Sequence, residues 1–465
     1  MTMETSARSP VVELWKREEG ILSPRCFSRR VGGSEALVMR LRNDKKLEKH
    51  GGCVNTVSFN SDGSILASGS DDRKIILWDW DAGTVKHQFH SGHINNVFQA
   101  RFMPLTDDSV MVTCAADGQV RQVNILQGGK VCTELLGEHE GRAHKLAVEP
   151  GSPYIFYSCG EDGMVQHFDL RTKTATKLLT CKNYQLSIIH LNAIAINPTD
   201  PNLFVVGGTD EYARMYDIRR YKWDGTSDIG RPVNLFCPAH LLGEDHLGIT
   251  GLAFSHHGEL LTSYNDENIY LFQKGQGLGP DSWLGPNREG MSPESEGPRV
   301  FEGHRNCETV KGVSFFGPNC EYVASGSDCG RLFIWRKSDA KLLRAMDGDK
   351  YVVNCIESHP CATVIASSGI DNDIKIWIPN STESATPVNI SELKHKRRNR
   401  FWQVALPEDL ITQVLARRRR RRDDDESEPN NSDLVNLLVQ WANGDDSSDE
   451  NSGQSSEGPG DCRVN

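Results

Sequence analysis

The chain has 465 residues, of which 37% are hydrophobic, and this length allows about three ordinary domains or one large repeat array with tails. It contains no run of roughly 20 apolar residues, so a membrane span is not expected. Its 13 cysteines include no C-x-x-C pair, so we expect neither a disulfide framework nor a zinc module, and a reducing compartment is favoured. The net charge of −11 lies in residues 423–465, which hold 12 acidic residues and one arginine, so the balanced residues 1–422 do not indicate a nucleic-acid-binding surface.

The first predicted element is a short helix at residues 9–20, SPVVELWKREEG. Ser9 is a suitable N-cap, and Gly20 is suited to end the helix. Leu14 and Trp15 belong to an apolar face that must pack on something. Two alternatives remain open, because the helix could pack on the body of its own chain or dock into a partner protein.

Seven similar strand–turn–strand segments follow the helix. The residues at their equivalent aromatic position are spaced by 45, 45, 48, 56, 63 and 42, and they are Trp78, Val123, Phe168, Tyr216, Phe272, Trp335 and Trp377. Each segment has an upstream stretch that alternates with period two, which is typical of half-buried strands. A period near 40–45 is typical of a propeller blade, and seven blades in a ring bury surfaces that one blade cannot bury. The sequence therefore predicts an all-β, seven-bladed propeller over residues 36–380.

Residues 36–50 are a spare strand segment ahead of the first repeat, and we expect them to complete the seventh blade. The stretch after Trp377 is an alternative source of that strand. Residues 1–35 then form an N-terminal segment, residues 381–422 a linker with an arginine-rich helix, and residues 423–465 an acidic tail. Short helices and disorder are expected in these terminal regions.

Two long spacings between repeats indicate insertions at residues 221–232 and 274–299. The second insertion is rich in Gly, Pro and Ser, so we expect a flexible loop. It is either a solvated insertion or a docking loop.

The C-terminal region has two further helix patterns, at residues 405–422 and 432–444. Six consecutive arginines end the first pattern at residues 417–422. They are either a nuclear import signal or a solvated helix end at the negative pole of the helix dipole. We favour import, and hence a protein of nucleus and cytoplasm, because the adjoining acidic residues would screen contacts with nucleic acid. The rest of residues 423–465 is too polar to fold.

Motifs for catalysis are absent from the sequence. It contains no G-x-x-x-x-G-K-[ST], H-E-x-x-H or G-x-S-x-G. The recurring histidines and aspartates occupy repeat positions, so neither catalytic residues nor a metal site nor a cofactor is expected. A binding protein is the favoured class.

The repeat motifs, which include Gly92-His93, Gly303-His304 and Trp78-Asp79, resemble the WD-repeat family. The resemblance implies a hydrogen-bonded structural tetrad of His, Ser or Thr, Asp and Trp in each regular blade. The first blade supplies all four residues, which are His50, Ser68, Asp72 and Trp78.

Two blades depart from this pattern. In the sixth blade, Cys329 takes the turn-Asp position and Asp328 lies one residue early, while the second blade has Val123 in place of Trp. We expect packing, more than the tetrad, to hold these two blades.

Two adjacent repeats end in Asp-x-Arg, and no other repeat has Arg at that position. The two sequences are Phe168-Asp169-Leu170-Arg171 and Tyr216-Asp217-Ile218-Arg219. They resemble the paired D-x-R boxes of the DCAF family, the WD-repeat substrate receptors of cullin-4 RING ubiquitin ligases.

This resemblance implies that Asp169, Arg171, Asp217 and Arg219 contact the adaptor, damaged-DNA-binding protein 1, and through it the cullin-4 ligase core. It also implies that the N-terminal helix, with Leu14 and Trp15, enters the adaptor. The chain would then present an unknown protein substrate for ubiquitination without itself being an enzyme. The alternative is a general WD-repeat scaffold in a chromatin or RNA assembly.

Overall fold

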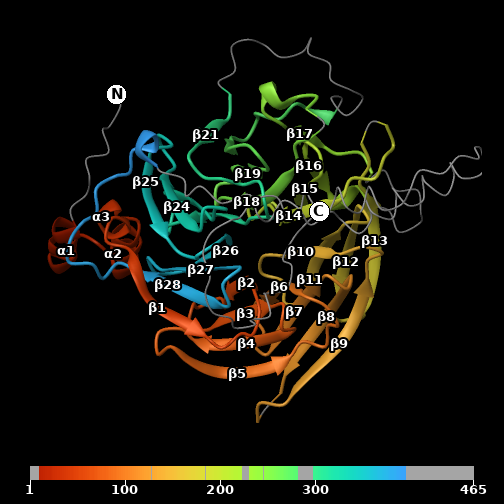
Figure 1. Cartoon of the computed structure of the whole chain (residues 1–465), viewed down its shortest axis with the longest axis horizontal. Coiled ribbons are helices and arrows are strands. Elements are labelled where there is room, and N and C mark those ends of the chain that lie inside the picture. Colours follow the sequence, from red (N-terminus) through yellow and green to blue (C-terminus); the bar gives the residue numbers. More distant parts are fainter. Residues whose placement is uncertain are drawn as a thin grey trace, which may run out of the picture. The chain divides into compact units, whose positions relative to one another are not determined.

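The computed structural model describes residues 10–126, 128–183, 185–221, 230–244, 246–280 and 297–393. Within these residues, seven four-stranded antiparallel sheets surround a common axis (Figure 1). The predicted all-β, seven-bladed propeller is confirmed. The predicted helices at 405–422 and 432–444 lie outside the described residues, as do the arginine run and most of both insertions.

Six blades are built from four consecutive strands each. Blades one to three are β2 (Val54–Phe59), β3 (Leu66–Ser70), β4 (Lys74–Asp79) and β5 (Thr84–His90); β6 (Val97–Phe102), β7 (Val110–Ala115), β8 (Gln119–Ile125) and β9 (Val131–Glu138); and β10 (Ala143–Val148), β11 (Ile155–Gly160), β12 (Met164–Asp169) and β13 (Thr174–Thr180). Blades four to six are β14 (Leu191–Ile196), β15 (Leu203–Gly208), β16 (Ala213–Asp217) and β17 (Asn234–Phe236); β18 (Ile249–Phe254), β19 (Leu260–Tyr264), β20 (Ile269–Phe272) and β21 (Arg299–Phe301); and β22 (Val313–Phe316), β23 (Tyr322–Ser325), β24 (Arg331–Arg336) and β25 (Leu342–Asp347).

The seventh blade closes the ring with a strand from the N-terminal end of the chain. Its strands are β26 (Val353–Ser358), β27 (Ile365–Gly369), β28 (Asp373–Ile378) and β1 (Arg42–Glu48), which lies antiparallel to β28. Leu47 of β1 is buried opposite Ile374. The expectation that residues 36–50 supply the closing strand is confirmed, and the stretch after Trp377 does not supply it.

The hydrophobic core lies largely between neighbouring blades. Ile75 and Leu77 of blade one, for example, pack with Val97 and Met111 of blade two. The second strands are buried along their length, whereas the outermost strand β5 is exposed at almost every residue. Side chains that pack between sheets therefore hold the ring together, as burial of both faces of each inner strand requires.

The antiparallel order within each blade gives the ring two distinct faces. The turns from first to second strand and from third to fourth strand lie on one face, which we call the Arg face because it carries Arg171 and Arg219. The turns from second to third strand and the connections between blades lie on the opposite face. We call this the His face, because His50, His93 and His139 precede the first strands there.

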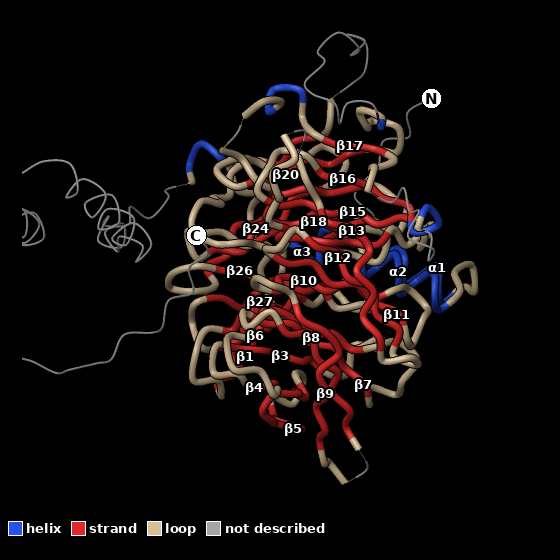
Figure 2. The backbone as a smooth tube through the Cα atoms, turned by 90° about the vertical axis from the view of Figure 1, so that its right-hand side faces the viewer, coloured by secondary structure: helices blue, strands red, loops and turns tan. Residues whose placement is uncertain are grey.

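Three N-terminal helices precede the ring: α1 (Pro10–Glu18), α2 (Pro24–Gly32) and α3 (Glu35–Val38). Figure 2 shows α1 and α2 together at one side of the propeller. Short 3-10 helices occur at η1 (Ile218–Arg220), η2 (Ala239–Leu241) and η5 (Ile390–Glu392). None of the helices in the described part of the chain is long and apolar enough to cross a membrane.

Candidate functional site

The first Asp-x-Arg sequence ends β12 of blade three as a closed local pair. The backbone N–H of Arg171 donates to Asp169 Oδ1 at 3.0 Å, which fixes the turn. The Arg171 guanidinium then donates to the same carboxylate, through Nε to Oδ1 at 2.9 Å and through Nη2 to Oδ2 at 2.7 Å. The Arg171 side chain nevertheless remains 59% exposed. Because the pair uses Nε and Nη2, the Nη1 edge of the guanidinium is left available to a partner.

The second Asp-x-Arg sequence repeats this geometry at the end of β16 in blade four. The Arg219 backbone N–H donates to Asp217 Oδ1 at 3.0 Å, and Arg219 Nη2 donates to Asp217 Oδ2 at 2.7 Å. The Arg219 side chain is also 59% exposed, and its Nη2 lies 3.7 Å from Asp200. Two neighbouring blades thus present the same oriented guanidinium on the same face.

The two aspartates remain charged at neutral pH. The hydrogen bond from Arg171 lowers the pKa of Asp169, and the hydrogen bond from Arg219 lowers the pKa of Asp217. Each arginine is therefore held in place by an ionised carboxylate, which reduces the entropy that a partner would otherwise have to remove.

A tyrosine extends the same surface. Tyr154, in the turn from first to second strand of blade three, is 44% exposed, and the Arg171 guanidinium lies 5.3 Å from the centre of its ring. An exposed aromatic ring beside an exposed arginine is a combination typical of interface hot spots. Sequence reasoning missed Tyr154, because a single aromatic residue in a turn carries no repeat signal.

Helix α1 presents apolar side chains to solvent. Leu14 is 43% exposed and Trp15 is 64% exposed, although both belong to the apolar face of the sequence pattern. The opposite side of the helix is tied to α2, since buried Glu13 accepts a hydrogen bond from Arg30 at 3.1 Å. Of the two alternatives for this helix, packing of Leu14 and Trp15 on the propeller is not what the structure shows.

The N-terminal helices are anchored to the Arg face. Glu35 of α3 forms a bidentate ion pair with Arg336, the last residue of β24, which precedes the turn from third to fourth strand of blade six. The carbonyl of Gly32, at the end of α2, accepts a hydrogen bond from Thr363 at 2.9 Å, and that of Gly33 accepts one from Tyr322 at 2.9 Å. Thr363 lies in a turn from first to second strand, and Tyr322 begins the strand that follows the equivalent turn. These contacts place the helical segment on the same face as Arg171 and Arg219.

The residues of the expected structural tetrad meet on the His face of blade one. His50 Nε2 lies 2.7 Å from Ser68 Oγ, His50 Nδ1 lies 3.0 Å from Asp72, and Trp78 Nε1 donates to Ser68 Oγ at 2.8 Å. Burial raises the pKa of Asp72, but hydrogen bonds from His50 and from the Gly51 backbone outweigh burial and lower it to about 2. Asp72 is therefore ionised and orients His50.

Blade two, which we expect to be held more by packing than by the tetrad, keeps most of the tetrad contacts. His93 still contacts Asp117 at 3.1 Å and Thr113 at 2.9 Å, and only the bond of the missing Trp is lost. Val123 fills the Trp position inside the core. Three of the four tetrad members therefore meet without the Trp, and the larger share of packing in this blade stays a prediction.

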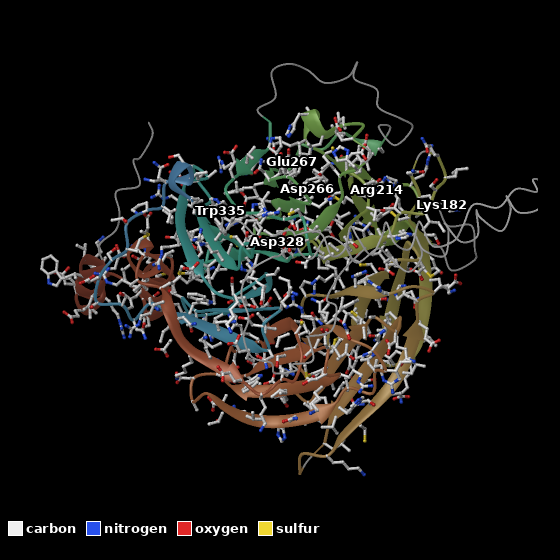
Figure 3. All side chains as sticks on the ribbon, viewed as in Figure 1. Lys182, Arg214, Asp266, Glu267, Asp328 and Trp335 are labelled. Carbon is white, nitrogen blue, oxygen red and sulfur yellow. The ribbon has the colours of Figure 1, made fainter. Side chains whose placement is uncertain are left out.

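Blade six lacks the tetrad, as the departure at Cys329 indicates, and it adds an ion pair that the sequence analysis did not expect. Asp328 turns away from the tetrad position and forms an ion pair with Lys311, and both side chains are fully buried. Neither ring nitrogen of His304 has a hydrogen-bond partner within the described residues, and burial lowers the pKa of His304 to about 3. A buried ion pair therefore replaces the tetrad in this blade. Figure 3 labels Asp328 and the nearby Trp335 of the same blade.

Blade seven uses a related arrangement. The Lys375 ammonium contacts Asp349 at 2.6 Å, Asp371 at 3.3 Å and Asp373, so the carboxylates that converge here surround a protein cation. Burial raises the pKa of Asp349 to about 7, even though Lys375 acts in the opposite direction. Sequence reasoning missed both buried lysines. The sequence feature that could have indicated them is a lysine within a predicted strand, or just before one, that is otherwise apolar.

Comparison with known families and proteins is consistent with this architecture. The family model "WD domain, G-beta repeat" matches residues 42–79, 296–336 and 340–377. The curated Arabidopsis thaliana "Protein ALTERED SEED GERMINATION 2" is 35% identical over 278 residues, which are 52% of this chain and 37% of that protein.

Two human proteins are similarly related. "DDB1- and CUL4-associated factor 6" is 35% identical over 274 residues, covering 56% of this chain and 31% of that protein. "WD and tetratricopeptide repeats protein 1" is 30% identical over 301 residues, covering 58% and 44%. The chain thus spans less than half the length of each of these relatives. The comparisons therefore show WD repeats in this chain and a similarity to a DDB1- and CUL4-associated factor.

Proposed function

We propose that this WD-repeat propeller is a non-catalytic substrate receptor that binds damaged-DNA-binding protein 1 (DDB1) through its Arg face and thereby joins a cullin-4 RING ubiquitin ligase. One observation carries the proposal. Arg171, Arg219 and the anchored N-terminal helices, which lie far apart in the sequence, are gathered on a single face. The similarity to a DDB1- and CUL4-associated factor supports the identity of the partner.

The arginine pairs suit a protein interface. Each guanidinium is held by its own aspartate and its side chain remains 59% exposed, so a carboxylate or a backbone carbonyl of the adaptor can bind it without reorganising the propeller. Tyr154 adds an aromatic surface beside Arg171. The ion pair fixes the orientation of the bound partner, and the aromatic ring adds apolar contact area. Interface hot spots typically combine these two contributions.

Helix α1 supplies the second part of the proposed interface. Its exposed Leu14 and Trp15 fit an apolar groove of the adaptor, in the manner of an amphipathic helix that binds by one face. Its link to the ring through Glu13, Arg30 and α2 leaves these side chains outside the core. Deleting the helix would then remove binding area while leaving every blade intact.

We also propose a more specific relationship within this type of receptor. Segments such as residues 46–60, 303–318 and 325–335, together with the Cys329 departure, resemble cullin-4-associated factor 8 more specifically. We propose a nuclear and cytoplasmic location, based on the arginine run at residues 417–422. The chain would act on its substrate by holding it near the ligase, which raises effective concentration.

The experiment is affinity purification of the tagged full-length chain from cells, with the co-purified proteins measured by quantitative mass spectrometry. We expect DDB1 and cullin-4 in near-stoichiometric amounts, and we expect the double variant Arg171→Ala, Arg219→Ala to lose both. Arg142→Ala is the matched control, because Arg142 is an exposed arginine on the His face.

A general scaffold gives a different result. If chromatin or RNA-processing proteins co-purify in place of DDB1, or if the double variant recovers as much DDB1 as the unaltered chain, the receptor proposal is wrong. Circular dichroism of the purified double variant shows whether the propeller is still folded.

A further inference from the structure

The His face carries a pocket of about 220 Å³ between blades three and six. Its walls come from connections that precede first strands and from turns between second and third strands, so it opens on the face opposite Arg171 and Arg219. The lining residues include Glu161, His190, Asn265, Asn306, Cys307 and Glu308. A volume of this size accommodates one long side chain.

An irregular segment of the repeat array forms one wall of this pocket. In blades one, two and three, the first strand begins four residues after its histidine, as from His50 to Val54. In blade six, the first strand begins only at Val313, nine residues after His304. The intervening residues leave the strand and form a loop that lines the pocket.

Asp328 holds this loop in place. It accepts hydrogen bonds from the backbone N–H of Cys307 at 2.6 Å and of Glu308 at 2.9 Å, and it forms the buried ion pair with Lys311. The side chain that would complete the tetrad of blade six therefore binds the loop and leaves His304 without a hydrogen-bond partner in the described structure. Blade six therefore lacks the hydrogen-bonded tetrad, and the aspartate that would belong to it stabilises the loop.

The loop is also fixed to the neighbouring blade. Asn306 is buried, and its Nδ2 donates to Thr250 Oγ1 at 2.8 Å and to the Tyr264 carbonyl at 2.6 Å, both in blade five. The pocket wall is therefore tied to two blades. Preformed walls with few degrees of freedom are typical of binding sites.

The pocket has the charge of a cation-binding site. Its lining includes the carboxylates of Glu161 and Glu308 and contains neither lysine nor arginine. Burial raises the pKa of Glu161, but the hydrogen bond from His144 and the backbone N–H of Arg142 outweigh burial, and the pKa lies below its usual range. Glu161 is thus ionised at neutral pH.

Two arginines stand near these carboxylates. Arg142 approaches Glu161 at 3.9 Å and Arg305 approaches Glu308 at 4.0 Å, and both arginine side chains are over 40% exposed, at 41% and 45%. Ion pairs this long and this exposed contribute little, so an entering cation can displace them into solvent.

We propose that this pocket binds the side chain of a lysine or arginine in a protein segment that the chain recruits. The inference deepens the proposed function, because it gives the chemistry by which a substrate would be recognised. It depends on residues of the His face only, so the two can be tested separately.

The test uses a positional-scanning library of random dodecapeptides, captured by the immobilised full-length chain. Four pools differ in one fixed residue, which is lysine, arginine, acetyl-lysine or citrulline. We expect the lysine or the arginine pool to be captured about tenfold better than its uncharged counterpart. The double variant Glu161→Gln, Glu308→Gln should lose this difference, and Glu140→Gln, which changes an exposed His-face carboxylate outside the pocket lining, should keep it.

Equal capture of charged and uncharged pools, or selectivity that persists in the double variant, overturns the proposal. Glu308→Gln alone provides a second variant at an exposed position, and circular dichroism of this variant shows whether it is still folded. DDB1 titrated against the same double variant should bind as it binds the unaltered chain. Failure of DDB1 to bind the unaltered chain would refute the receptor proposal and leave the peptide result to decide the pocket.

Discussion

The buried ion pair of blade six makes a quantitative prediction. Lys311 and Asp328 have no solvent-exposed side-chain surface, and Asp328 also accepts two backbone hydrogen bonds from the loop. Asp328→Ala would leave a buried ammonium with only neutral oxygens of Asn306 and Thr309 as partners. Removing one member of a buried pair costs about 3–5 kcal/mol of the free energy of unfolding. The loss is a large part of the total of about 5–15 kcal/mol that a domain has.

The pH dependence gives a second, signed prediction for the same variant. Burial lowers the pKa of Lys311 from its ordinary value of 10.5, and Asp328 opposes that effect. Without Asp328 the folded-state pKa falls further, so the unfolded chain binds more protons than the folded chain over a wider range. The stability of Asp328→Ala should therefore rise with pH by up to about 1.4 kcal/mol per unit, beginning at lower pH than in the unaltered chain.

Urea denaturation followed by tryptophan fluorescence at pH 7, 8 and 9 measures both effects. The double variant Lys311→Met, Asp328→Ala is the matched control, because it removes both charges. It should lose the extra pH slope and recover part of the stability, but not the part that comes from the two backbone hydrogen bonds to Asp328. A single variant that is within 1 kcal/mol of the unaltered chain, or that has the same pH slope, would refute this reasoning.

Three other outcomes are expected. Leu14→Ala with Trp15→Ala should weaken DDB1 binding at least tenfold in pull-down titrations and shift the melting temperature little, because both side chains are exposed; a large fall in melting temperature would show instead that they stabilise the ring. Ser68→Ala should cost about 2–4 kcal/mol by chemical denaturation, because it leaves two buried tetrad partners without their hydroxyl, and a cost below 1 kcal/mol would show that the tetrad is dispensable. Removing residues 417–465 should shift a fluorescently tagged chain toward the cytoplasm while it keeps DDB1, and an unchanged nuclear fraction would exclude the arginine run as an import signal.

The ring could be predicted because its information is local and repeated. Alternation with period two, together with recurring turns, marks each strand, and the spare segment at residues 36–50 has only one open place in the ring. The strands β17 and β21 were harder to find, since each is three residues long and follows an insertion.

The Asp-x-Arg pairs could also be predicted, because they stand out against five repeats that lack them. The two pairs have the same hydrogen-bond geometry because they occupy equivalent positions on consecutive blades. The attachment of α3 through Glu35 and Arg336 could not be predicted, since 301 residues separate the partners and neither belongs to a motif.

The buried ion pairs could not be predicted from the repeat motifs. The repeat motifs show where blades two and six depart from the tetrad, but they do not show where the remaining polar groups go. In blade six, Asp328 forms an ion pair with Lys311, which lies in a segment that the sequence pattern predicts to be a strand. A buried charge has to be paired, so an unmatched lysine in such a segment was the signal.

Isothermal titration of purified DDB1 into the purified full-length chain tests the central claim most directly. Four proteins are compared: the unaltered chain, Arg171→Ala, Arg219→Ala and the double variant. Each single change should cost about 2–5 kcal/mol of binding free energy, which is the cost of truncating one partner of a charge-assisted contact at an interface, and the double variant should show no measurable heat. Unchanged affinity in the double variant, or no binding by the unaltered chain, would contradict the assignment of the Arg face as the adaptor-binding surface.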